Sequence, residues 1–335
     1  MSARYVFRSS VLLFACAALA CSGDSPDPFT PPVDDPGPAT PQPATSLAFL
    51  PGQWTVSAVR FVDGAAVDTL GGVSTIGQSL NQRATKEVLR IGLADGTVAV
   101  MEALIARRAS SDTWAIGRGD AAEGTFDVLQ GGFASGAGTF VSQSESRPDG
   151  GLTRLRFSEA FQDSFVVHID QSTDAGTSWA SEWRFAYTRG AGTAPVGATV
   201  NACGTEGHRQ FDFWLGNWNA LGTNGQVNGT NDIRSRLGGC ILEENWVSSP
   251  SGTSFNMYDV RTELWYQMWV DANGYLLTIQ GTRDREQLSM SGTDGTLGQR
   301  ITWTDLGDGR VRQFGETEQV SGVWTTAYDL TYALR

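Results

Sequence analysis

The two halves of the chain repeat one another, and this duplication constrains the fold more than any other feature of the sequence. The segment Phe49–Trp54 (FLPGQW) returns in the second half as Phe213–Trp218 (FWLGNW). Further matches follow in the same order, namely Glu87 with Glu244, Trp114 with Trp265, Gln130 with Gln280, Arg154 with Arg300 and Tyr187 with Tyr332. Because this order is shared, we interpret residues 47–190 and 203–335 as two copies of one domain, joined by a linker at 191–202.

Each copy is predicted to consist of antiparallel strands. Apolar and polar residues alternate in Gln53–Phe61 and again in Ser181–Tyr187, which is typical of half-buried strands. Turn pairs such as Asp63-Gly64 and Asn273-Gly274 separate the runs and favour hairpins. Roughly 8–10 strands in each copy predict an all-β fold of two consecutive antiparallel up-and-down, lipocalin-like β-barrels, and barrels of this size can hold a small ligand.

Two segments of the second copy also point to a known family. The chain reads FDFWLGNW at Phe211–Trp218 and WYQMWVD at Trp265–Asp271. These segments resemble the pattern of a widespread family of uncharacterised bacterial proteins with a lipocalin-like, calycin-type barrel. The resemblance covers nearly all of 208–335, and the first copy matches more loosely. It implies the barrel fold and no particular activity, because none is established for the family.

The first residues have the layout of an export signal. Arg4 and Arg8 precede the apolar run Val11–Ala20, which is too short to span a bilayer as a helix, so we predict a signal peptide over 1–20. The ending Ala-Leu-Ala before Cys21 resembles the bacterial lipoprotein signal and implies a lipid anchor on that cysteine. Simple secretion remains the alternative, because Leu19 is one position nearer to the cysteine than in the usual pattern.

The segment after the cysteine is predicted to be a disordered tether over 21–46. Eight of the twelve prolines lie between Pro26 and Pro43, and such a segment cannot bury a core. In lipoproteins of this kind, Ser22 after the cysteine implies the outer membrane. We therefore expect an envelope protein that contacts the membrane only through its N-terminal lipid.

The composition excludes several classes of function. The chain has 24 Lys+Arg against 36 Asp+Glu, a formal charge of −12, which disfavours binding to nucleic acid. It has 2 histidines and no recognised hydrolase, phosphate-loop or metalloprotease motif, so we expect no metal site, no cofactor and no catalytic triad. His168 lies in an alternating run and is interpreted as an ordinary strand residue, although some lipocalin-like barrels bind haem through one histidine.

Cys203 and Cys240 are expected to form a disulfide. In an exported protein, two cysteines set apart from the lipidation site are typically bridged. The alternative is a reactive thiol. The first copy contains no cysteine, so a bridge would stiffen the second copy alone.

The residues that point most directly to a site lie in Leu264–Val270. Alternation places Trp265, Gln267 and Trp269 on one face and bulky apolar residues on the other, so both faces should be covered. We predict that the second barrel binds a small apolar or amphipathic ligand. The candidate binding residues are Trp218, Glu244, Trp265, Gln267, Trp269, Gln280 and Arg300.

Two other functions remain open from the sequence. Calycin-type barrels include enzymes whose cavities use carboxylates for proton transfer, and here Glu244 would act with Arg300 or Arg312. Alternatively, both barrels are solidly packed and serve as structural or protein-interaction modules. A non-catalytic role is the prediction that we carry forward.

Overall fold

The computed structural model describes residues 42–335 except 112, 143–149 and 321. The predicted signal peptide, the lipidation site Cys21 and most of the predicted tether lie outside the described residues. The described residues belong to one compact unit by their internal contacts.

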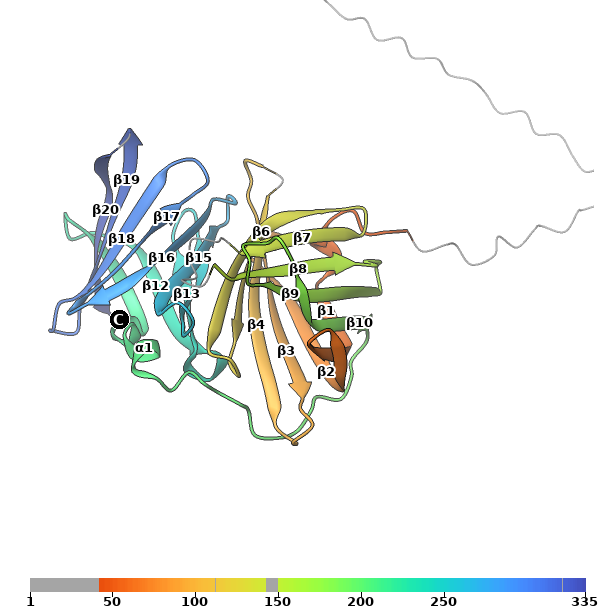
Figure 1. The fold of residues 1–335 in the computed structure, drawn as a ribbon. Coiled ribbons are helices and arrows are strands. Elements are labelled where there is room, and N and C mark those ends of the chain that lie inside the picture. Colours follow the sequence, from red (N-terminus) through yellow and green to blue (C-terminus); the bar gives the residue numbers. More distant parts are fainter. Residues whose placement is uncertain (1–41, 112, 143–149, 321) are drawn as a thin grey trace, which may run out of the picture. The chain divides into compact units, whose positions relative to one another are not determined.

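The first copy closes into a β-barrel (Figure 1). Counted over the described residues, its ten antiparallel strands are β1 (Gly52–Val62), β2 (Ala65–Ser79), β3 (Ala84–Gly92), β4 (Val98–Arg107), β5 (Trp114–Asp120), β6 (Thr125–Ala134), β7 (Ala137–Ser142), β8 (Leu152–Ser158), β9 (Ser164–Ser172) and β10 (Ala180–Arg189). Sequence neighbours are also sheet neighbours, and β1 pairs with both β2 and β10, which is an up-and-down closure.

The second copy has the same topology. Its ten described strands are β11 (Gly216–Gly222), β12 (Val227–Arg236), β13 (Ile241–Val247), β14 (Gly252–Asp259), β15 (Leu264–Asp271), β16 (Leu276–Asp284), β17 (Gln287–Thr293), β18 (Gly298–Asp305), β19 (Val311–Val320) and β20 (Val323–Leu334). β11 pairs with β12 and β20. The prediction of two consecutive closed antiparallel barrels is therefore confirmed.

Helices in the described residues are short. α1 spans Glu206–Arg209, and single 3-10 turns occupy Leu47–Phe49, Leu80–Gln82, Asp212–Trp214 and Leu237–Gly239. No helix within the described ranges is both long enough and apolar enough to cross a bilayer.

Equivalent residues make equivalent contacts in the two barrels, as the duplication predicts. The indole Nε1 of Trp54 donates to the Leu50 carbonyl at 2.8 Å, and that of Trp218 donates to the Trp214 carbonyl at 2.9 Å. Gly131 and Gly281 both lie where a neighbouring strand passes closely, and a Cβ on either would lie 2.8 Å from a Cα of that strand. The internal repeat is thus visible in contacts that the sequence did not specify.

Some strands are buried on both faces because the outer walls of the barrels pack together. β4 is buried along almost its whole length, and Val100 and Leu104 on its outer face share an apolar cluster with Met257, Tyr266 and Met268 of the second barrel. The bulky second face of Leu264–Val270 is covered by this cluster. At its edge, Lys86 Nζ lies 2.5 Å from Glu243 Oε1.

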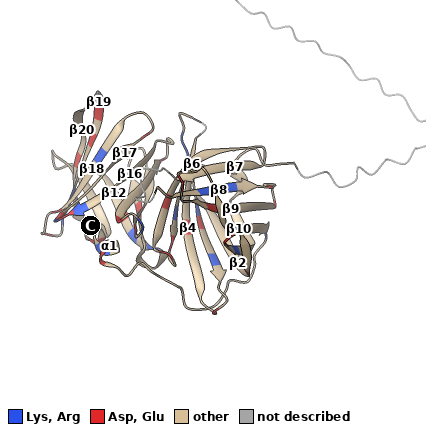
Figure 2. Cartoon of the chain, in the orientation of Figure 1, with Lys and Arg blue, Asp and Glu red and all other residues tan. Residues whose placement is uncertain are grey.

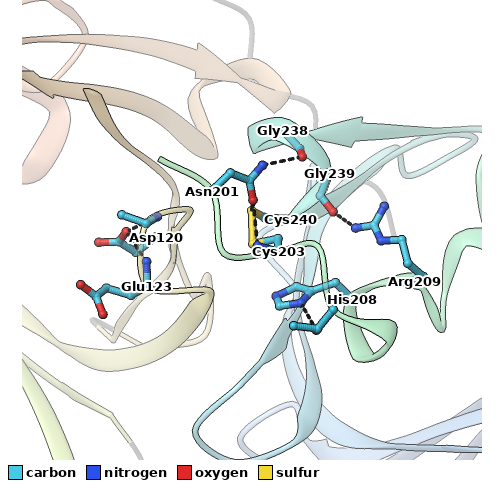
Figure 3. Close-up of a disulfide and its surroundings, with 11 residues drawn as sticks. Asp120, Glu123, Asn201, Cys203, His208, Arg209, Gly238, Gly239 and Cys240 are labelled. Carbon is cyan, nitrogen blue, oxygen red and sulfur yellow. Dashed lines mark hydrogen bonds between the residues drawn. A yellow bond between two sulfur atoms is a disulfide. The ribbon is translucent and has the colours of Figure 1, made fainter. Parts of the chain in front are cut away.

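The predicted disulfide is present between Cys203 and Cys240, and both residues are buried (Figure 3). Cys203 follows the connecting segment, which is hydrogen-bonded to the first barrel through the Val98 amide and the Ala198 carbonyl at 2.9 Å. Beside the bridge, Asn201 Nδ2 donates to the Gly238 carbonyl at 2.8 Å. The disulfide therefore ties the end of the connecting segment to the start of β13.

Charged residues pair locally on the outer surfaces. Figure 2 shows basic residues on β8 next to β9, where Arg154 and Arg156 both bind Asp170. His168 also lies on this outer face, with Ser158 Oγ at 3.4 Å from its Nε2. Within the described residues, no group of three or more His, Cys, Asp or Glu side chains is arranged to hold a metal ion.

Candidate functional site

The lumens of the two barrels differ greatly in free volume. The second barrel encloses a cavity of about 350 Å³, whereas the cavity in the first is about 40 Å³. Eight strands give an interior just wide enough for side chains to fill, and the diameter grows with strand number, so a ten-stranded barrel has space to spare. Side chains therefore decide whether that space is filled or left open.

An aromatic floor closes one end of the second lumen. Phe211 stacks on Trp214 with ring centroids 4.9 Å apart and meets Trp265 and Trp303 edge-on at 5.4 Å and 5.2 Å. Phe211, Trp214, Trp265 and Trp303 are 0 % exposed. These residues come from the turn before β11 and from β15 and β18, and they belong to the buried core of the second barrel.

A belt of polar side chains lies in the lumen of the second barrel. Glu244 on β13 accepts hydrogen bonds from Asn231 Nδ2 at 2.7 Å and from the Ser254 hydroxyl at 2.8 Å. The belt continues along β14 and β15, because Asn256 Nδ2 donates to Ser254 at 2.9 Å and Gln267 Nε2 donates to Asn256 Oδ1 at 2.8 Å. Four neighbouring strands thus contribute to one hydrogen-bonded polar wall.

Burial raises the pKa of Glu244 to about 7, because desolvation disfavours its charged form more than the bonds from Asn231 and Ser254 favour it. Glu244 is 4 % exposed. The cavity is lined by no Lys or Arg from the described part of the chain. Glu244 is thus a carboxyl group near its midpoint at neutral pH, facing a cavity without a counter-ion.

Three aromatic side chains line the walls above this belt, and each is seated on a glycine. A Cβ added to Gly229 would lie 2.6 Å from the Trp246 ring. Added to Gly252 it would meet the Trp269 ring, and added to Gly315 it would meet the Tyr328 ring, in both cases closer than 3.0 Å. Because the glycines carry no side chain, the rings can lie against the wall. This arrangement leaves the centre of the lumen open.

The first barrel has apolar residues where the second has its polar wall. Strand register pairs Glu87 with Ala103 and Glu244 with Ser254, so Ala103 and Ser254 are equivalent. By the same register, Ile105 and Ile116 form a pair where the second barrel has Asn256 and Gln267. Three polar positions of this wall, Ser254, Asn256 and Gln267, are thus apolar in the first barrel, while the carboxyl group is present in both.

The same comparison explains the difference in volume. Register places Met101 of the first barrel at the position of Gly252, and Ile169 at the position of Gly315. Both side chains line the small first cavity, together with Arg118 at the position of Trp269. The first lumen is filled by side chains that the second lacks.

The seven residues predicted from the sequence to bind a ligand lie in three different places. Glu244, Gln267 and Trp269 line the cavity. Trp218 and Trp265 are buried in the core, where Trp265 Nε1 donates to Gln210 Oε1 at 3.2 Å. The remaining two, Gln280 and Arg300, lie on the outer wall of the barrel.

Arg300 is not brought to Glu244. Its Nε lies 2.7 Å from Glu316 Oε2, and its guanidinium covers the Trp324 ring with 42 % of the side chain exposed. Arg312 likewise pairs with Asp329 at 2.8 Å on the outer surface. The carboxylate–arginine pair considered from the sequence is therefore absent from the described second lumen.

Gln280 lines a separate groove of about 470 Å³ between β6 and β14–β17. The charges of this groove already satisfy one another, since Arg261 binds Asp127 at 2.9 Å and also contacts Asp259. This groove is larger than the second-barrel lumen, but its walls show no group whose charge is left uncompensated.

Several residues that line the cavity or bind Glu244 were not predicted from the sequence. Trp246 and Tyr328 were not singled out, nor were Asn231, Ser254 and Gln313. Two signals were available. Trp246 is two residues after Glu244 and so shares its face of the strand, and Gly252 stands where the first copy has Met101.

Comparisons with known proteins give no family. No family model matches the chain, and no curated protein matches it. Among the solved structures that match, two do so at 12 % identity. One is the structure of EF1p2_mFAP2b bound to DFHBI, with a TM-score of 0.27 over 44 % of this chain and 98 % of that one. The other is a DUF3598-family protein of unknown function from Nostoc punctiforme, with a TM-score of 0.21 over 85 % of this chain and 96 % of that one. These scores are too low to support an argument, and the fold rests on the sheet topology.

Proposed function

We propose that the second barrel binds a small amphipathic molecule. Its apolar body would lie between Trp246, Trp269 and Tyr328, and its polar end would reach Glu244. The observation that carries this proposal is the contrast between two copies of one scaffold. The first lumen is filled by side chains, whereas the second is open, with a polar wall beneath aromatic rings.

The size of the two cavities supports the assignment. Pockets for small molecules typically enclose about 300–1,000 Å³, are mostly apolar and carry a few placed polar groups. The second cavity, at about 350 Å³, falls in this range. The first, at about 40 Å³, has room for little more than a water molecule. We assign the first barrel a structural role.

A blocked cavity tests this proposal directly. N-phenyl-1-naphthylamine is a neutral amphipathic dye that fluoresces in apolar surroundings and serves as the probe. Gly315→Ile introduces the residue that fills the equivalent position of the first barrel and should lower dye affinity at least about tenfold. Gly77→Ile is the matched control, because Gly77 has nothing within 4 Å of an added Cβ. Equal dye binding by wild type and a folded Gly315→Ile variant would reject the cavity as the site.

Proton-transfer catalysis is a second candidate, favoured by the pKa of Glu244, about 7, within a cavity. 5-Nitrobenzisoxazole reports on such a base: its C3 proton passes to the carboxylate, the N–O bond breaks and a coloured phenolate leaves. Turnover that depends on Glu244 would show that the cavity supports base chemistry. A probe that binds without being converted would rule out base catalysis and leave ligand binding as the proposed function.

We also propose that the protein is exported and anchored through a lipid on Cys21. The buried Cys203–Cys240 disulfide supports export, because structural disulfides persist in oxidising compartments. Mass spectrometry of the mature protein should find an N-terminal peptide that begins at a lipidated Cys21, and Cys21→Ser should release the protein from the membrane fraction. A mature chain that starts elsewhere would exclude the anchor and leave the binding proposal intact.

A further inference from the structure

The polar wall of the second lumen is oriented so that acceptors face the cavity. Asn256 Nδ2 donates to the Leu242 backbone carbonyl at 3.0 Å, and since that carbonyl can only accept, the orientation of the Asn256 amide is fixed. Asn256 Oδ1 must then accept, and Gln267 Nε2 is its donor at 2.8 Å. Gln267 lines the cavity, so its carbonyl oxygen Oε1 is the group that it presents there.

Glu244 adds a carboxyl group beside that acceptor. Both of its described bonds come from neutral donors, Asn231 and Ser254. Asn231 Oδ1 is itself buried and has no hydrogen-bond partner among the described residues. The cavity lining therefore carries the oxygen acceptors of Glu244 and Gln267, whereas Asn231 is not part of that lining. Gln313, whose Oε1 accepts from Tyr332 at 2.6 Å, offers an N–H there.

Among the residues that the structure describes, no Lys or Arg lines the cavity around Glu244. β20 brings Tyr328 and Tyr332, and burial holds the pKa of both well above the usual tyrosine value. Glu316 of β19 is compensated by Arg300 on the outer wall. β12, β14, β15 and β18 present the uncharged side chains Asn231, Ser254, Asn256, Gln267 and Gln299.

Aromatic faces complete the surroundings. Trp246, Trp269 and Tyr328 line the same cavity. The π-face of an aromatic ring attracts cations, most strongly when water is excluded. A carboxylate between aromatic walls is therefore complementary to a positively charged head group, and it disfavours an anionic one, which would meet uncompensated like charge.

We infer that the ligand of the second barrel carries a cationic amine, whose N–H groups bind Glu244 and Gln267 and whose charge is flanked by the aromatic walls. This inference rests on the proposed binding function and specifies its ligand class. Binding holds Glu244 in its ionised form, so affinity increases with pH as that carboxyl group loses its proton. The excess of acidic residues in the chain, 36 against 24 basic, also favours the approach of cations.

Three indole probes with matched bodies test the inference by titration calorimetry on the mature chain: tryptamine (cationic), tryptophol (neutral) and indole-3-propionate (anionic). At pH 8, tryptamine should bind at least about tenfold more tightly than tryptophol, the size expected for hydrogen bonds to a charged group. Glu244→Gln should reduce this preference to within about threefold. Glu87→Gln, the matched change in the first barrel, should leave the preference intact.

Lowering the pH from 8 to 5.5 should weaken tryptamine binding by wild type and not by Glu244→Gln, since the probe stays protonated throughout. A tryptophol affinity equal to or above that of tryptamine overturns the inference, as does tightest binding of indole-3-propionate. Binding of the neutral naphthylamine dye without any indole also overturns it and leaves the proposed function standing. Failure of every probe, the dye included, overturns both.

Discussion

The hydroxyl of Tyr187 donates a hydrogen bond of 3.0 Å to Oε1 of Glu87 in the first barrel. The equivalent tyrosine of the second barrel, Tyr332, gives its hydroxyl to Gln313 instead. Glu87 is thus closed off by Tyr187, by Ser74 at 2.7 Å and by Arg118 in the same lumen. Glu244 is bonded by Asn231 and Ser254 instead, and no arginine lines its described cavity, so the same carboxyl has a cation in one lumen and none in the other.

In the polar wall, removing one hydrogen-bond partner should destabilise the protein more than its share of the cost of removing all the partners together. Asn256→Ile alone leaves the buried Gln267 amide without its acceptor and should lower the free energy of unfolding by about 1–3 kcal/mol. The triple variant Ser254→Ala, Asn256→Ile, Gln267→Ile reproduces the first-barrel wall and should cost less than the sum of its single changes. Urea unfolding measures each value, and strict additivity would contradict the hydrogen-bonded chain.

Glu244 should make the protein less stable as the pH rises. Its pKa is raised from 4.5 to about 7 in the folded protein, so between these values the folded state binds more protons than the unfolded state. Stability therefore falls as pH rises from about 4.5 to 7, and the loss is complete above 7.

Relative to Glu244→Gln, wild type should lose up to about 3 kcal/mol over that range, measured by chemical unfolding in a series of buffers. Because the glutamine variant cannot titrate at this position, it isolates this group from other buried carboxyls such as Glu87. Parallel pH profiles for the two proteins would show that Glu244 keeps an ordinary pKa.

Loss of the disulfide should destabilise the protein through its unfolded state. Cys203 and Cys240 are separated by 37 residues, and closing a loop of this length is worth about 3–4 kcal/mol of chain entropy. The double variant Cys203→Ser, Cys240→Ser, which leaves no unpaired thiol, should lower the free energy of unfolding by that amount. Calorimetry of wild type with and without reductant is the parallel measurement. An unchanged unfolding transition would mean that the disulfide adds nothing to the free energy of unfolding.

The ion pair between the barrels should matter more than one on the surface. Lys86 and Glu243 are 23 % and 9 % exposed, and Lys86 also donates to Thr253 at 3.0 Å. Lys86→Met leaves a largely buried carboxylate without its cation and should cost about 1–3 kcal/mol. Arg310→Ala removes the exposed Arg310–Asp308 pair and should change nothing measurable. Equal effects of the two changes would argue that the Lys86–Glu243 contact is loose in solution.

The architecture was predictable from the residue pattern alone. Strands and hairpins follow from local patterns, namely the alternation and the Asp-Gly and Asn-Gly turns. The duplication follows from comparing the two halves of the chain with each other, so neither prediction needs coordinates. Cys203 and Cys240 were likewise predictable, because few cysteines leave few pairings. Alternation also placed Glu244 opposite Glu243, and it placed Gln267 and Trp269 on one face.

Which residues line the same cavity could be seen only in the folded barrels. Period-2 alternation tells that two side chains lie on the same face but not at which height in the barrel, and it cannot tell the inner face from the outer one. Trp265 therefore lies in the buried core, Gln280 and Arg300 lie on the outer wall, and Tyr328 lines the cavity with Glu244 from a strand distant in sequence. The open lumen depends on Gly252 and Gly315, whose meaning appears only when a ring from the neighbouring strand is seen lying over each of them.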